Sequence, residues 1–86
     1  MDIHEEISQL NETLKRQRDE LKLRIHLVGM EAREEWDKTE DKWVQFRGRH
    51  KELEKAGKES ALDIGAALRL LGEEIRHAYD RVRKSI

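Results

Sequence analysis

The sequence predicts an all-α protein built from long amphipathic helices. Apolar residues recur at steps of three and four along almost the whole chain, the spacing of one face of a helix. Charged residues make up 43% of the 86 residues and occupy the positions between them. This composition is typical of coiled coils and long helices, and the regular apolar spacing argues against a disordered chain. We therefore expect one helical domain over residues 1–86.

The first predicted helix begins near Ile3, where Asp2 and Glu5 have the spacing of a capping box. Its apolar stripe continues past Gly29, because the stretch "IHLVGMEAREEW" contains no Ser, Asp, Asn or Pro with which to form a turn. We therefore predict one straight helix over about residues 3–56, which would be about 80 Å long. The stripe positions in it are Ile3, Ile7, Leu10, Leu14, Gln17, Leu21, Ile25, Val28, Ala32, Trp36, Thr39, Trp43, Phe46, His50 and Leu53.

A helix–helix turn is predicted at residues 57–60. Gly57 suits a left-handed residue that ends the long helix, while Ser60 and Asp63 suit the cap of a new helix. The alternative is that Gly57 lies inside a continuous helix, at a cost of about 1 kcal/mol relative to alanine. With the turn, a C-terminal helix over about 61–86 folds back antiparallel in a coiled-coil-like hairpin, and the two stripes match. The predicted hairpin core is Trp36, Trp43, Phe46, Leu53, Ile64, Leu68, Leu71, Ile75 and Val82.

Residues 3–28 carry an equally apolar stripe, which must also be covered. It matches residues 32–57 in an antiparallel sense, so three segments of similar length fit one three-helix core. The chain could bend at Gly29 and form a monomeric three-helix bundle. Because turn residues are missing there, we favour a homodimer in which the arm 3–28 packs on the partner's hairpin, formed by 30–56 and 61–86.

A second apolar stripe lies nearly opposite the first. It is either a tolerated exposed surface or the contact through which two such dimers pair into a tetramer. It consists of Leu23, Leu27 and Met30 on the arm side, and of Leu62, Ala66 and Leu70 on the last helix. Gln17, a polar residue on the seam, is expected to help fix the register. The predicted self-association residues are Ile3, Ile7, Leu10, Leu14, Gln17, Leu21, Leu23, Leu27 and Met30.

The sequence predicts no catalytic, cofactor-binding or metal site. The histidines His4, His26, His50 and His77 are too widely spaced for a helical metal pair, and no nucleophile or phosphate-binding motif is present. Gly65 and Gly72 are interpreted as close-packing positions between helices. Net charge is −1 and divides evenly along the chain, which makes nucleic acid an unlikely partner. The absence of cysteine and of long apolar runs favours a cytoplasmic protein.

The blocks "EAREEWDKTEDKW" and "LLGEEIRHAYDRVRKSI" resemble a group of small bacterial coiled-coil proteins, some of them described as stress-associated or apolipoprotein-like. In that group an Ala/Glu-rich run leads to a tryptophan, a second aromatic and a basic amphipathic C-terminal helix; Trp36 and Trp43 fill the aromatic places here. The resemblance covers about residues 20–86 and implies a bacterial, cytoplasmic helical protein with no defined activity.

Two functions remain open from the sequence. The matched stripes favour a structural or interaction module that self-associates, with a protein partner as a further option and without catalysis. The alternative is reversible binding to a lipid or membrane surface, in which the hairpin opens and the C-terminal helix lays its apolar face, with Tyr79 and its Arg/Lys cluster, on the membrane.

Overall fold

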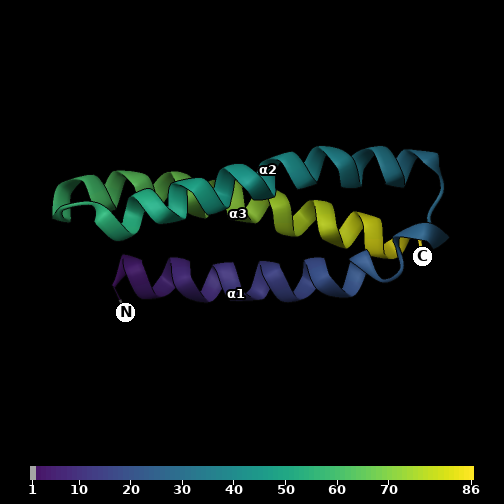
Figure 1. The fold of residues 1–86 in the computed structure, drawn as a ribbon, viewed down its shortest axis with the longest axis horizontal. Helices are drawn as coiled ribbons and strands as arrows, with labels where there is room; N and C mark the ends of the chain where they lie inside the picture. The colour runs from purple at the N-terminus through teal and green to yellow at the C-terminus, as the bar shows by residue number, and fades with distance from the viewer. Residues whose placement is uncertain (1) are drawn as a thin grey trace.

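The computed structural model describes residues 2–86 and confirms the all-α class (Figure 1). Three helices pack side by side: α1 (Ile3–Lys22), α2 (Met30–Lys55) and α3 (Lys58–Lys84), with a 3-10 turn at Ile25–Leu27 between the first two. The chain runs up, down and up again, so α1 and α3 point the same way and α2 runs against both. The Cα atoms span 43 × 19 × 15 Å.

The prediction of one straight helix over residues 3–56 is wrong. α1 ends at Lys22, the chain makes the 3-10 turn, and Val28 is extended (φ −90°, ψ 155°) before α2 begins at Met30 with Gly29 as its N-cap. Ile25 and Val28 pack against the core, so this bend is stabilised by burial of apolar side chains and needs no turn-forming residue. The three-helix alternative bent at Gly29 describes the chain correctly.

The turn between α2 and α3 lies at Ala56 and Gly57, so it overlaps the predicted turn at 57–60 only at Gly57, and α3 begins at Lys58 instead of near residue 61. Its chemistry also differs from the prediction. Ala56 and Gly57 are both extended, with φ of −79° and −72°, so Gly57 is not left-handed. Gly57 is also the N-cap of α3, and Ser60 lies inside that helix without capping it. Two extended residues are therefore enough to reverse the chain. At the first helix, by contrast, the Asp2 carboxylate accepts a hydrogen bond from the Glu5 backbone N–H at 2.9 Å.

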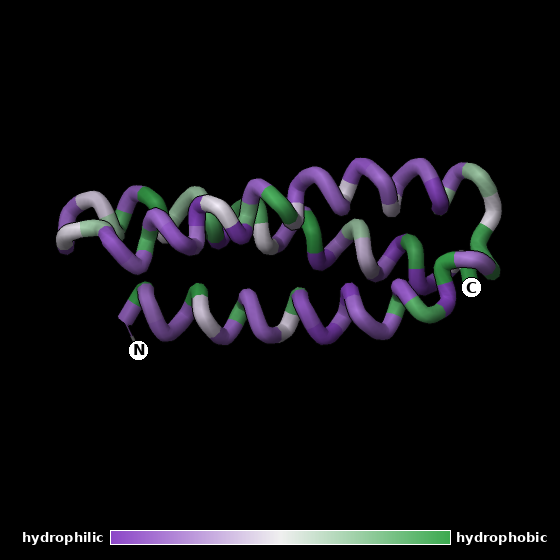
Figure 2. Tube along the Cα trace, in the orientation of Figure 1, coloured by the Kyte–Doolittle hydropathy of each residue, from purple (hydrophilic) through white to green (hydrophobic). Residues whose placement is uncertain are grey.

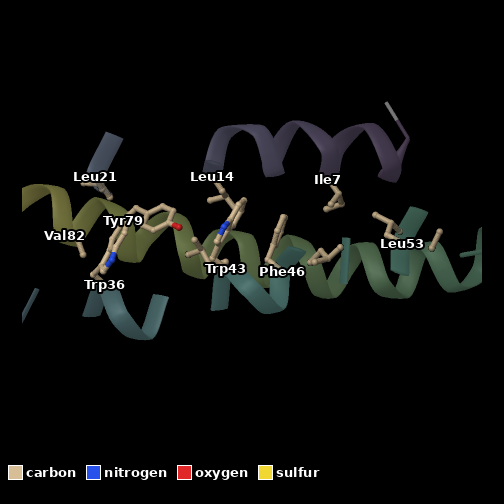
Figure 3. Packing of buried hydrophobic residues seen from close by; sticks show 12 residues of the cluster. Ile7, Leu14, Leu21, Trp36, Trp43, Phe46, Leu53, Tyr79 and Val82 are labelled. Carbon is tan, nitrogen blue, oxygen red and sulfur yellow. The ribbon is translucent and has the colours of Figure 1, made fainter. Parts of the chain in front are cut away.

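The apolar stripes of all three helices meet in one continuous core (Figures 2 and 3). Ile7, Leu14 and Leu21 of α1 point toward the side chains of α2 and α3 in Figure 3, and none of them is more than 5% exposed. The stripe of residues 3–28 is therefore covered by the same chain. The predicted arm therefore needs no partner hairpin, because α1 packs against α2 and α3 of its own chain.

Two glycines let α1 approach α3 closely. A Cβ atom added at Gly65 would lie 2.1 Å from Cγ1 of Ile3, and one added at Gly72 would lie 2.4 Å from Cδ2 of Leu10. Ile3 and Leu10 therefore occupy the space that larger residues on α3 would fill. The interpretation of both glycines as close-packing positions agrees with this geometry.

Each pair of helices is also joined by an ion pair. Arg18 on α1 donates two hydrogen bonds of 2.7 Å to the Glu40 carboxylate on α2. Arg69 on α3 binds Glu6 on α1 in the same two-pronged manner, at 2.6 and 2.8 Å. α2 and α3 are joined by two such contacts, Lys42 with Glu74 and Arg81 with Glu35. Such charge-assisted pairs fix how the helices are aligned along one another.

Candidate functional site

The predicted self-association residues divide into an inner and an outer group. Ile7, Leu14 and Leu21 are buried in the core, and Ile3, Leu10 and Gln17 are half-buried at its edge. Leu23, Leu27 and Met30 are exposed instead, at 78%, 60% and 82%. Only this outer group is available to another molecule.

The predicted hairpin core residues all lie in or against the core. Those that are buried are Trp36, Trp43, Phe46, Leu53, Leu68, Ile75 and Val82; Ile64 and Leu71 are half-buried beside them. The two indoles take part in aromatic pairs. Trp43 stacks on Phe46 with ring centroids 5.9 Å apart, and Trp36 packs on Tyr79 at 5.8 Å. These rings are therefore structural and are not a platform for a ligand.

The exposed apolar side chains Leu23, Leu27 and Met30 lie at one end of the bundle, which we call the tip. The tip comprises residues 22–31 and 81–86, because α3 ends beside the connection between α1 and α2 (Figure 1). Ile86, 42% exposed, adds a fourth apolar side chain there. Figure 2 shows the concentration of apolar residues in this connection. Leu23, Leu27 and Met30 are each more than half exposed, which makes the tip a candidate interaction surface.

The tip is also basic. It contains five Lys or Arg residues, Lys22, Arg24, Arg81, Arg83 and Lys84, against a single acidic residue, Glu31. The opposite end, formed by residues 2–6 and 52–60, has the reverse balance, with six acidic residues against Lys55 and Lys58. Two of the tip cations are paired with carboxylates just outside the tip, Arg81 with Glu35 and Arg83 with Asp80, so among the described residues the unpaired positive charge of the tip rests on Lys22, Arg24 and Lys84. Part of the reason for these cations is that α1 and α3 both end at the tip, where cations stabilise helix C-termini.

A second exposed apolar surface, the α3 flank, consists of Leu62, Ala66 and Leu70. Leu62 and Leu70 are 65% and 74% exposed, and Ala66 lies between them on the same face of the helix, away from the core. A groove of about 600 Å³ runs beside Leu62, between the first turns of α1 and α3, and Ile3 and Ala61 supply its apolar lining. This surface lies nearer to the acidic end.

Between α1 and α3, near the tip, two buried polar atoms have no hydrogen-bond partner among the described residues. They are Oε1 of Gln17 and the hydroxyl of Tyr79, a side chain only 1% exposed. Both residues line a pocket of about 310 Å³ that also contains Arg24, Asp80 and Arg83. Burial raises the pKa of the Tyr79 hydroxyl, and the nearby Glu40 carboxylate adds to this effect while Arg18 opposes it.

The raised pKa of Tyr79 predicts a loss of stability in alkali. Above the ordinary tyrosine pKa of 10.0 the unfolded chain releases this proton while the folded chain keeps it, so the free energy of unfolding falls as pH rises. Tyr79→Phe should remove that part of the decline. At neutral pH it should leave stability unchanged or raise it by about 1 kcal/mol, because an unpaired buried hydroxyl is costly.

Urea unfolding from neutral pH to alkaline pH, compared between the wild type and Tyr79→Phe, measures this effect. Tyr79 is the only tyrosine, so tyrosinate absorbance in the native protein reports its titration directly. Titration of the folded protein near the ordinary pKa would contradict the burial of the hydroxyl.

Among residues 2–86, no group of three His, Cys, Asp or Glu side chains is placed to hold a metal ion. No helix in this range is long and apolar enough to cross a membrane. The carboxylates that bridge helices are each bound by Arg or Lys.

Comparison with protein-family models, with curated proteins and with solved structures finds no match for this chain.

Sequence reasoning missed two features of these surfaces. Tyr79 was assigned to a membrane-binding face, although its position seven residues after Gly72 continues the row that faces α1. The second feature is the gathering of cations at the tip. The up-down-up order of the helices brings residues 22–31 and 81–86 together, and the sequence predicts that order only in the alternative bent at Gly29.

Proposed function

We propose that this protein is a non-catalytic interaction module that self-associates through the α3 flank. The observation that carries the proposal is the exposure of Leu62 and Leu70 on a regular helix face, in a bundle whose seam residues are otherwise buried. An exposed row of this kind on a helix is typical of a helix–helix contact. In this proposal the α3 flank, and not the arm 3–28, is the surface by which two copies bind. We also propose that the protein acts in the cytoplasm.

The spacing of the flank suits a two-fold contact between antiparallel copies of α3. With Ala66 at the two-fold axis, Leu62 faces the partner's Leu70, and the small side chain at the centre lets the two helices approach. The partner's Leu70 would then lie beside the groove lined by Ile3, Ala61 and Leu62. The groove thus offers room for the one large side chain that the contact brings to it.

The experiment is sedimentation equilibrium on the wild type and on the double variant Leu62→Glu/Leu70→Glu. We expect a concentration-dependent dimer for the wild type and a monomer of about 10 kDa for the variant. Both side chains are exposed, so the variant should remain folded, which circular dichroism would verify. Val44→Glu is the matched control, because Val44 is a 68% exposed apolar residue on α2, outside both surfaces.

A wild type that stays monomeric at high micromolar concentration would contradict the proposal. So would a dimer that the flank variant forms as readily as the Val44 control.

A further inference from the structure

We infer that the tip of the bundle is a docking surface for an anionic lipid bilayer. This goes beyond self-association, because the tip and the α3 flank are separate surfaces. It also differs from the opening of the hairpin considered from the sequence, since the closed bundle already exposes everything the tip would insert.

Leu23, Leu27 and Met30 of the tip are not part of the buried core. In the connection between α1 and α2, Ile25 and Val28 pack against the core and account for the bend. Leu23, Leu27 and Met30 alternate with them and face outward, exposed by 60% or more. Polar residues would serve equally well in an exposed connection, so these three are explained by a contact with another apolar phase.

The cations of the tip lie in the two segments, 22–31 and 81–86, that also carry its exposed apolar side chains. Arg81 and Arg83 are held by Glu35 and Asp80, whereas Lys22, Arg24 and Lys84 form no ion pair within residues 2–86. Stabilisation of the ends of α1 and α3 accounts for cations in these last turns. It does not account for their coincidence with three exposed apolar residues. That combination is the one that binds interfaces of anionic lipids, where cations contact headgroups and apolar side chains enter the acyl boundary.

The size of the tip favours a bilayer over a protein partner. The bundle is 19 × 15 Å across its Cα atoms, and an end of that size falls short of the roughly 800 Å² per partner that stable protein interfaces bury. A bilayer imposes no such requirement, because a few side chains can insert individually. Long Lys and Arg side chains can also keep their charges at the headgroups while the apolar residues penetrate.

Vesicle flotation tests the inference. The full-length protein should bind vesicles made of equal parts phosphatidylglycerol and phosphatidylcholine, and should bind vesicles of pure phosphatidylcholine much more weakly. Leu23→Asn/Leu27→Asn/Met30→Asn should weaken binding by more than about 100-fold, since it removes the inserted surface. Arg24→Gln/Lys84→Gln should weaken binding to the anionic vesicles by roughly tenfold or more. Val44→Asn, an equally exposed apolar site away from the tip, should bind as the wild type does.

A site-specific probe shows which part enters the membrane. The chain contains no cysteine, so Met30→Cys and Val44→Cys can each carry a single environment-sensitive fluorophore. On the anionic vesicles the label at position 30 should shift to the blue and the label at position 44 should not. Equal shifts at both positions would overturn the inference in favour of a helix lying along the membrane. Equal binding by the triple variant, or no binding to anionic vesicles, would also overturn it.

The two proposals can fail separately. The monomeric flank variant Leu62→Glu/Leu70→Glu should retain vesicle binding through its tip, although each particle then carries one tip in place of two. Loss of binding by the tip variant together with an unchanged sedimentation profile supports the tip alone. An altered profile for the tip variant would instead assign these residues to self-association and overturn the inference.

Discussion

Trp43→Ala is expected to destabilise the protein by about 3–5 kcal/mol, because truncation of a buried tryptophan removes apolar burial and leaves a cavity. Trp43 is only 4% exposed and stacks on Phe46, which is completely buried. The cavity would lie in the middle of the core, where α1, α2 and α3 all contribute side chains (Figure 3). Domains of this size are stable by roughly 5–15 kcal/mol, so the variant should lose a large part of its stability.

Urea unfolding followed by far-ultraviolet circular dichroism measures this loss without depending on tryptophan fluorescence. Val44→Ala is the control, since the neighbouring side chain is 68% exposed and should change stability by less than about 0.5 kcal/mol. If both variants unfolded at the same urea concentration, Trp43 would not be a core residue.

Gly72→Leu should separate α1 from α3. Its first added atom would lie 2.4 Å from Cδ2 and 3.1 Å from Cγ of Leu10, and 3.3 Å from Phe46. The flexible end of Leu10 can move, but the rest of a leucine side chain needs space that α1 occupies. We expect a net loss of about 1–3 kcal/mol from overpacking, even after the gain in helix propensity.

Gly48→Leu provides the control for that gain. Gly48 lies in α2, and a Cβ atom there would meet nothing within 4 Å. Because the type of substitution is the same, glycine to leucine within a helix, the propensity gain of up to about 1 kcal/mol should appear at Gly48 without the clash. Opposite changes in the free energy of unfolding are therefore expected for the two variants. A Gly72→Leu protein as stable as Gly48→Leu would mean that α1 does not rest on α3 at this position.

The helical class and most of the buried seam could be predicted from the sequence, because both depend on local periodicity. Residues such as Phe46, Leu68 and Ile75 recur at helical spacing whichever helix covers them. The bend at residues 23–29 could not be predicted in the same way. It depends on Ile25 and Val28 finding the core of their own chain, which is a tertiary contact and leaves no turn signature in the sequence.

The candidate surfaces also differ in how far local periodicity predicts them. The exposed row of Leu62, Ala66 and Leu70 could be predicted from its spacing, since it lies opposite the seam of a regular helix. The tip could not, because its cations come from two segments more than fifty residues apart in the chain. Only the order of the helices brings Arg24 and Lys84 to the same end of the molecule.

The central claim is that one chain bends between α1 and α2 and covers its own core. Spin labels on Gln9→Cys and Arg49→Cys, at exposed positions of α1 and α2, test it through their intramolecular distance in pulsed electron paramagnetic resonance. Labelled protein is diluted with unlabelled protein, so that only distances within a chain are recorded. In the bundle, whose Cα atoms span 19 × 15 Å in cross-section, the two labels should lie within about 30 Å of each other, with helix axes spaced by about 10 Å. A distance of about 60 Å, the length of a straight helix between these positions, would contradict the fold.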